Sequence, residues 1–217
     1  MQTHLPFADM LLQTYVNVDD FMKNFEPWWN QKLIEDGKKR RNRKMRLNLS
    51  EIATIYICFA YSKQSNFKSY YEFLMKYHAK DFKYVSYDRY ITLIKRILKP
   101  LIYLLNSIKG EAMFINFIDS TPMEVCKLTR KNRHKVFANI AESGRTSVSW
   151  FYGLKLHTIF NHKGELVSLC ITGGNKSDRS VVKGLCNGLK GKLFGDKGYI
   201  SNKLFKDLFA EGVELIR

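Results

Sequence analysis

Apolar side chains recur every three or four residues in the first half of the chain, a spacing typical of amphipathic helices. Helices are predicted over residues 9–34, 52–61, 67–78 and 87–108. Ser50 and Ser86 are suitable N-cap residues for the second and fourth of these segments. Pro100 should kink or split the fourth helix. The pattern therefore predicts a helical region over residues 1–110.

The pattern changes at residue 113, where short β-rich segments alternate with turns and helical segments. Strands are predicted over residues 113–118, 150–161, 165–172, 192–195 and 213–216, and helices over 179–189 and 202–210. The first strand is expected to end on Asp119. The order β-β-β-α-β-α-β predicts a mixed sheet with helices on its faces, so the fold class is α+β or α/β, with a second domain over residues 111–217.

The excess of basic over acidic residues predicts that the protein binds a polyanion. The chain has 36 Lys and Arg against 20 Asp and Glu, a formal net charge of +16, while 45% of its residues are hydrophobic. Such a hydrophobic content excludes a disordered basic tail. There is no apolar run long enough to span a membrane and no signal peptide, so nucleic acid is the expected partner. The four cysteines form no CxxC pair and are expected to be reduced thiols.

Basic side chains concentrate in two segments. The first, residues 38–46, has seven basic residues within nine positions: Lys38, Lys39, Arg40, Arg41, Arg43, Lys44 and Arg46. The second follows the first strand and contains Arg130, Lys131, Arg133, His134 and Lys135. Each segment can be a solvated loop or a phosphate contact, and in so basic a chain phosphate contact is favoured, because it releases counterions from DNA. The short helices beside the first segment are compatible with a helix-turn-helix DNA reader.

Two acidic residues follow apolar strands. Asp119 comes after Phe-Ile-Asn-Phe-Ile, and Asp196 comes after Lys-Leu-Phe-Gly. A carboxylate beside an apolar core needs a compensating partner, and a divalent cation such as magnesium is one that binds hard oxygen ligands. Metal ions shared by two acids could assist attack on a phosphodiester. The alternative is that each aspartate only caps the turn after its strand.

An ordered series of motifs resembles the DDE domain of bacterial insertion-sequence transposases, above all the family numbered nine-eight-two. The motifs are Asp119-Ser120-Thr121-Pro122, His134-Lys135-Val136-Phe137, Trp150-Phe151-Tyr152-Gly153, Gly174-Asn175, Asp178-Arg179 and Gly195-Asp196-Lys197-Gly198-Tyr199. The resemblance implies an RNase H-like fold and metal-dependent cleavage and strand transfer at transposon ends. It implies Asp119 and Asp196 as catalytic metal ligands, Mg²⁺ or Mn²⁺ as cofactor, DNA as partner, homo-oligomers on paired ends, and a cytoplasmic, nucleoid-associated location.

The sequence departs from this family at the third catalytic acid. Members carry a Glu on a helix well beyond Asp196, whereas Glu211 and Glu214 lie too close to Asp196 to occupy that place. The expectation is an incomplete copy, truncated before the third acid. The alternative function is therefore a non-catalytic DNA-binding remnant or an inhibitor of transposition.

The remaining motif residues have less specific expectations. Lys155 and His157 share one face of a strand, which faces either DNA or solvent, and His157 can equally be a structural histidine. Lys197 and Tyr199 lie beside Asp196 and are candidate DNA contacts. Asn175, Ser177 and Asp178 are expected to form a turn and an N-cap. Trp28, Trp29 and Trp150 are expected in hydrophobic cores.

Overall fold

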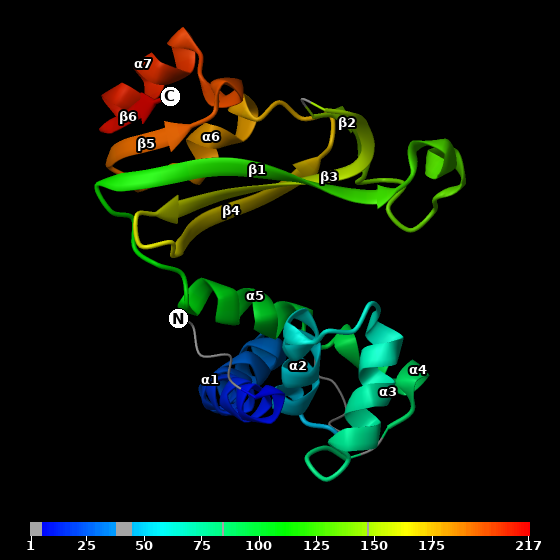
Figure 1. The fold of residues 1–217 in the computed structure, drawn as a ribbon. Coiled ribbons are helices and arrows are strands. Elements are labelled where there is room, and N and C mark those ends of the chain that lie inside the picture. The colour runs from blue at the N-terminus through cyan, green and yellow to red at the C-terminus, as the bar shows by residue number, and fades with distance from the viewer. Residues whose placement is uncertain (1–5, 38–44, 84, 147) are drawn as a thin grey trace. The chain divides into compact units, whose positions relative to one another are not determined.

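The computed structural model describes residues 6–37, 45–83, 85–146 and 148–217 (Figure 1). The chain divides into two compact units, Met1–Ile108 and Lys109–Arg217. No helix in these described ranges combines the length and the apolar character needed to cross a membrane.

The first unit is helical. Its helices are α1 (Phe7–Glu35), α2 (Leu49–Cys58), α3 (Phe67–Tyr77), α4 (Tyr87–Ile94) and α5 (Leu98–Ser107), with a short 3₁₀ turn, η1 (Phe59–Tyr61). Tyr70, Tyr90 and Leu74 are fully buried in its core. The Tyr90 hydroxyl donates to the Ile52 carbonyl at 2.8 Å, which satisfies a polar group that burial would otherwise penalise.

Two boundary predictions in this unit have different outcomes. The long helix predicted after Ser86 is split into α4 and α5, with Pro100 in the first turn of α5, as expected from its missing N–H. The cap predicted at Ser50 is wrong. Asn48 caps α2 through a capping box with Glu51, and the buried Ser50 instead bonds to Asp19 of α1, which lowers the pKa of that carboxyl group.

The second unit is built on a mixed sheet. Its strands are β1 (Ile115–Cys126), β2 (Glu142–Arg145), β3 (Trp150–Asn161), β4 (Leu166–Gly173), β5 (Gly191–Gly195) and β6 (Val213–Ile216). The order is β2-β3-β1-β5-β6, with β4 paired to β3. β3 runs antiparallel to β1, β2 and β4, whereas β5 runs parallel to β1 and β6. This mixed sheet after a helical region confirms the predicted fold class and is compatible with an RNase H-like fold.

The first strand is longer than predicted. The apolar pattern ends on Asp119, but β1 continues to Cys126 because β3 pairs with it from Asn116 onward along its whole length. Pairing with β5 covers only Ile115 to Ile118. Asp119 therefore lies within β1, at the point where one of its two neighbouring strands ends.

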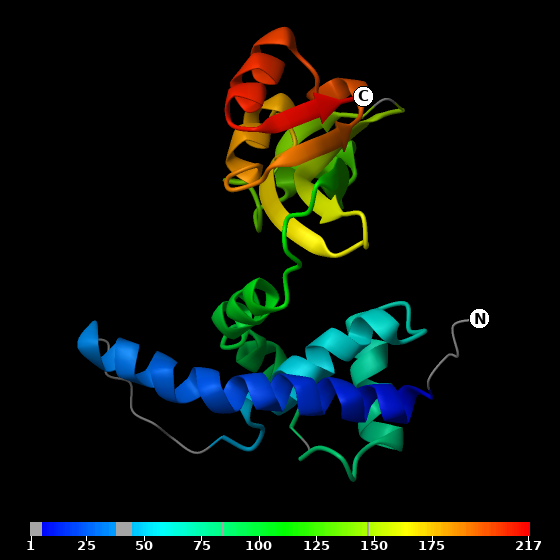
Figure 2. The same ribbon diagram turned by 90° about the vertical axis from the view of Figure 1, so that its left-hand side faces the viewer.

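Two helices, α6 (Arg179–Leu185) and α7 (Asn202–Ala210), pack on one face of this sheet (Figures 1 and 2). Their apolar residues form one core with fully buried Ile159 and Leu193 of the strands. The opposite face carries Phe117 and Phe160, which are paired across β1 and β3 and remain partly exposed. The covered face therefore holds the core of the unit.

The β2–β3 hairpin bends back over the sheet. The bend brings Gly144 of β2 against the Gly173–Gly174 turn, where a Cβ on Gly144 would lie 2.2 Å from the Gly174 carbonyl oxygen. Only glycine permits this approach, which fixes the hairpin beside the turn that leads to α6.

Candidate active site

The two candidate catalytic acids are neighbours. Ile118 of β1 pairs with Gly195 of β5 in parallel register, so Asp119 and Asp196 occupy the next position along each chain. Neighbouring strands lie about 4.8 Å apart. Both residues are exposed. The parallel pairing of β1 with β5 accounts for this proximity of two residues that are far apart in the sequence.

Both carboxylates are held by the backbone that follows them. One oxygen of Asp119 accepts from the Ser120 N–H at 2.8 Å, and one oxygen of Asp196 accepts from the Lys197 N–H at 2.6 Å. In each case this bond uses the Oδ1 atom and leaves the lone pairs of Oδ2 for another partner. The turn-capping role considered for these residues is thus compatible with metal binding.

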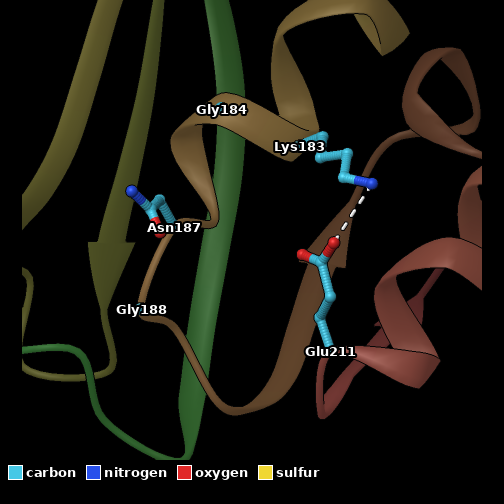
Figure 3. A pocket seen from close by; sticks show the side chains of 5 residues that line it. All are labelled: Lys183, Gly184, Asn187, Gly188 and Glu211. Atoms are coloured by element: carbon cyan, nitrogen blue, oxygen red, sulfur yellow. Dashed lines mark ion pairs between the residues drawn. The ribbon is translucent and has the colours of Figure 1, made fainter.

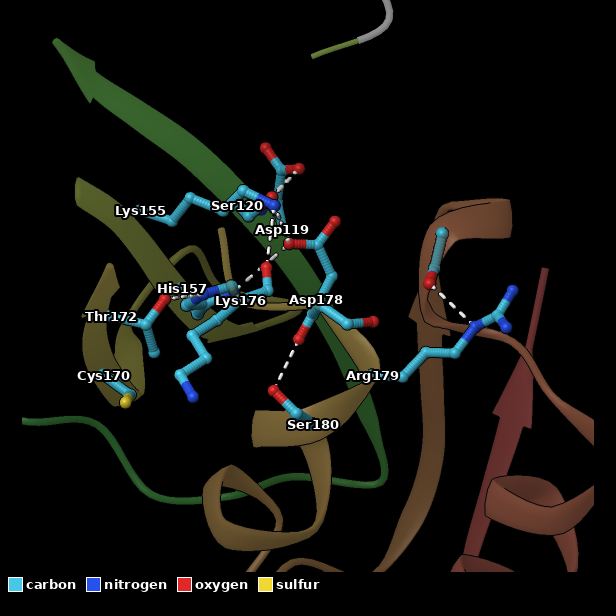
Figure 4. Close-up of polar contacts among 12 residues, drawn as sticks. Asp119, Ser120, Lys155, His157, Cys170, Thr172, Lys176, Asp178, Arg179 and Ser180 are labelled. Carbon is cyan, nitrogen blue, oxygen red and sulfur yellow. Dashed lines mark hydrogen bonds and ion pairs between the residues drawn. The ribbon is translucent and has the colours of Figure 1, made fainter. Parts of the chain in front are cut away.

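The turn after Asp196 is fixed from two sides. It is the 3₁₀ segment η3 (Lys197–Tyr199), and the Arg179 guanidinium at the start of α6 donates to the Gly198 carbonyl at 3.1 Å (Figure 4). Tyr199 is buried beneath it, and burial raises the pKa of its hydroxyl to about 12. The carboxylates of Asp178, Asp119 and Asp196 act in the same direction, which places all three near one phenol.

A third carboxylate, Asp178, enters the site from the start of α6. Its Oδ1 lies 3.1 Å from the Lys155 ammonium, which also donates to the Lys176 carbonyl at 3.0 Å (Figure 4). His157 is fully buried, with Nε2 3.0 Å from the Thr172 hydroxyl and Nδ1 3.9 Å from Asp178. Burial lowers the pKa of His157, while the Asp178 carboxylate acts in the opposite direction. This network ties the loop before α6 to β3.

The N-cap role predicted for Asp178 is only half right. Asp178 occupies the N-cap position of α6, but its side chain makes no capping hydrogen bond and pairs with Lys155 instead. Sequence reasoning missed this pair because the partners lie on separate elements. Lys155 and His157 do share a strand face, yet His157 has no exposed surface and Lys155 has little, so the structure gives both internal partners.

The structure describes the second basic segment but only the end of the first. Residues 38–44 lie outside the described residues, and Arg46 is exposed. The second segment forms the 3₁₀ turn η2 (Leu128–Arg133) and the residues after it. Its exposed basic residues are Arg130, Lys131, Arg133 and Lys135; Lys127 just before η2 and Lys197 beside Asp196 are also exposed. His134 instead stacks on Phe137, with ring centroids 5.9 Å apart.

The three tryptophans do not share one environment. Trp29 is half-buried and stacks on Phe25 in the first unit, and Trp28 lies beside it with 45% of its surface exposed. Trp150 is 59% exposed. The core position predicted is therefore wrong for Trp28 and for Trp150. Trp150 begins β3 at the end of the hairpin, where its side chain faces away from the core.

The donors in the site suit a magnesium-type ion in chemistry but are few in number. Within the described ranges, no three His, Cys, Asp or Glu side chains cluster closely enough to hold a metal ion. Mg²⁺ keeps several waters and is commonly bound through one or two protein carboxylates together with substrate phosphates. Asp119 and Asp196 fit that pattern, with DNA phosphate supplying further oxygens.

A separate hollow lies between the ends of α6 and α7. It is lined by Lys183, Gly184, Asn187, Gly188 and Glu211 (Figure 3). Lys183 and Glu211 form an ion pair at 3.1 Å. These residues precede β5 and β6, so the hollow lies at the amino ends of these strands. Asp196 follows the carboxyl end of β5, so the hollow is not part of the acidic site.

Comparison with known families defines the class of protein. Residues 109–217 match the family model described as a transposase DDE domain. The chain therefore belongs to the DDE transposase family, as its motifs and sheet had indicated. No curated protein matched the chain.

Proposed function

We propose that the chain is the transposase of an insertion sequence and that its second unit cleaves and joins DNA at transposon ends. The observation that carries the proposal is the parallel pairing of Ile118 with Gly195 in a DDE transposase domain, which brings Asp119 and Asp196 to the next position of each chain. A role limited to turn capping would not require two exposed acids at the same level of one sheet.

Asp119 and Asp196 would be the protein ligands of Mg²⁺ or Mn²⁺. When bound, such an ion lowers the pKa of an attacking water or 3′-hydroxyl and stabilises the leaving oxygen. The backbone bonds from Ser120 and Lys197 orient the two carboxylates before DNA arrives. Arg179 and the buried Tyr199 hold the turn after Asp196 in place. Positioning of this kind supplies much of the rate of phosphoryl transfer.

Exposed basic side chains on both units would bind DNA phosphates. In the second unit these are η2, Lys135 and Lys197, which we assign to phosphates beside the cleaved bond. Residues 38–46 and the first unit would bind transposon ends. Two copies on paired ends, acting on chromosomal DNA in the cytoplasm, complete the proposal.

The test is cleavage of DNA that carries the ends flanking the gene for this chain, with magnesium, manganese or neither. We expect metal-dependent nicks at the element's boundary, releasing 3′-hydroxyl ends. Asp119→Asn should abolish them, because an amide is a poor ligand for a hard cation. Glu124→Gln is the matched control, because Glu124 is an exposed acid on the same strand. Cleavage that survives Asp119→Asn would refute the assignment.

One observation favours a second candidate, a DNA-binding protein without catalysis. The described residues contain no cluster of three metal-ligating side chains, which the complete family site would need. Such a protein would bind the same ends with an affinity that falls with salt, yet it would leave them uncut with either metal. Binding without cleavage under conditions where a complete relative cleaves its own ends would select this alternative.

A further inference from the structure

The β2–β3 hairpin carries an aromatic side chain, Trp150, that lies outside the hydrophobic core. Trp150 faces Arg145 across the β2–β3 pair, and the Arg145 guanidinium carbon lies 5.8 Å from the centroid of the Trp150 ring. Trp150 is 59% exposed, and Val148 in the connecting turn is 91% exposed. The next two residues along β3, Phe151 and Tyr152, are buried and already pack the base of the hairpin.

Leaving a tryptophan in water forgoes the stabilisation that burial of so large an apolar surface provides. The arrangement is unfavourable for the isolated protein but suited to a partner with a flat, unsaturated surface. The adjacent guanidinium narrows the class of partner, because arginine beside an aromatic ring both stacks and attracts negative charge. An apolar protein surface or a lipid tail would gain nothing from that charge.

The surroundings of the hairpin point to nucleic acid. The Lys131 ammonium donates to the Ser143 hydroxyl at 3.2 Å and so links the basic turn η2 to β2. The hairpin also lies against the Gly173–Gly174 turn that leads to α6, since a Cβ on Gly144 would come 2.2 Å from the Gly174 carbonyl oxygen. An exposed aromatic ring paired with a guanidinium, on a hairpin bonded to a basic turn, suits a partner that is both negatively charged and aromatic, as DNA is.

We propose that Trp150 and Arg145 form a stacking site for an unpaired base of DNA. Every base has a π-face, so such a site is tolerant of sequence, and it takes only bases that have left the duplex stack. Arg145 supplies a cation beside the ring and a donor for the adjoining phosphate. The proposal rests on the transposase function and deepens it by naming how the second unit holds strand ends, but it requires no catalysis.

The test compares binding of a fluorescent 15-nucleotide oligothymidylate and of a fully paired duplex of the same length to the full chain, without metal. Trp150→Ala should weaken single-strand binding by about 5- to 150-fold, the range that loss of one aromatic–base stack gives. Duplex binding should change less than twofold. Trp150→Phe should retain most of the affinity. Arg145→Lys keeps the charge but loses the planar group, so it should weaken single-strand binding alone. Phe209→Ala removes a 63% exposed aromatic on α7 and is the matched control.

Intrinsic fluorescence gives a readout that a folding defect would not mimic. Stacking on a base should quench the parent protein, and Trp150→Phe should lose that quenching while Trp28 and Trp29 still emit. Equal single-strand affinity for the parent and Trp150→Ala would overturn the proposal, as would equal losses on single strand and duplex. Because these measurements involve no cleavage, failure of the catalytic assignment leaves them unaffected, and failure here leaves cleavage by Asp119 and Asp196 untouched.

Discussion

Asp119 and Asp196 stand at the same level of neighbouring parallel strands, each one residue beyond the paired Ile118 and Gly195. The relationship depends on the register of β1 against β5. A slip of one residue would turn one carboxylate to the other face of the sheet. The site is therefore a consequence of strand pairing, and its supports can be tested separately from the acids themselves.

The Lys155–Asp178 pair should stabilise the second unit. Both side chains are mostly buried, at 12% and 25% exposure, so removing one partner leaves a buried charge without its bond. Asp178→Asn or Lys155→Met should each lower the free energy of unfolding by about 1.5–3 kcal/mol, measured by urea denaturation. The double variant should lose less than the sum of the two. Additive losses would show that the two groups do not interact.

His157 should make stability depend on pH. Burial lowers the pKa of His157 in the folded protein, whereas the unfolded chain has the ordinary value near 6.5. Above pH 6.5 both states are neutral and the effect is absent. As the pH falls below 6.5, the unfolded chain takes up a proton that the folded ring does not, so the free energy of unfolding decreases toward the folded pKa.

Hydrogen exchange of β3 amides between pH 7.5 and 5.5, corrected for the intrinsic exchange rate, measures that decrease. Asp178 and Lys155 face the imidazole and act in opposite directions, so the variant must remove the ring alone. His157→Gln can still bond to Thr172 and should flatten the pH dependence. An unchanged slope in His157→Gln would rule out His157 as the titrating group.

The N-cap of α2, Asn48, should contribute measurably to the free energy of unfolding. Asn48 accepts from the Glu51 N–H at 2.6 Å, and the Glu51 carboxylate accepts from the Asn48 N–H at 2.6 Å. Asn48→Ala should cost about 1 kcal/mol of unfolding free energy, followed by the circular dichroism of the helical unit. Asn48→Asp should recover most of it. A loss below about 0.3 kcal/mol for Asn48→Ala would contradict the capping role.

The basic turn should govern the salt dependence of DNA binding. Replacing Arg130, Lys131 and Arg133 with Gln should weaken binding and reduce the slope of log affinity against log salt by about 0.9 for each phosphate that is no longer neutralised. The control variant removes three exposed charges at or near α7: Lys190, Lys203 and Lys206. If both triple variants reduce the slope of log affinity against log salt equally, η2 is not a specific DNA-binding segment.

The sequence predicts most of the elements but not the pairing that builds the site. Apolar spacing located the main helices and five of the strands, because burial leaves a period in the residues. Strand β2 (Glu142–Arg145) carries no apolar residue and exists because β3 pairs with it, so its residues held no signal. The second half of β1, residues 121–126, likewise forms a strand through its pairing with β3, and its mixed residues do not form a clear apolar strand pattern.

Residue chemistry singled out Asp119 and Asp196 as candidate acids, since a charged residue after an apolar strand is conspicuous. The chemistry of Asp178 was ambiguous, because an aspartate before a helix is an ordinary N-cap. Only the fold brings Lys155 of β3 against it. The exposure of Trp150 likewise follows from the bent hairpin, which no local pattern specifies.

Direct metal binding tests the central claim most closely. Manganese titrated into the full chain loses its free-ion paramagnetic resonance signal as it binds, with no need for DNA or activity. We predict that the parent and Glu124→Gln reduce this signal equally, and that Asp119→Asn and Asp196→Asn each leave it near the protein-free level. Undiminished manganese binding by both aspartate variants would contradict the account of a metal shared between Asp119 and Asp196.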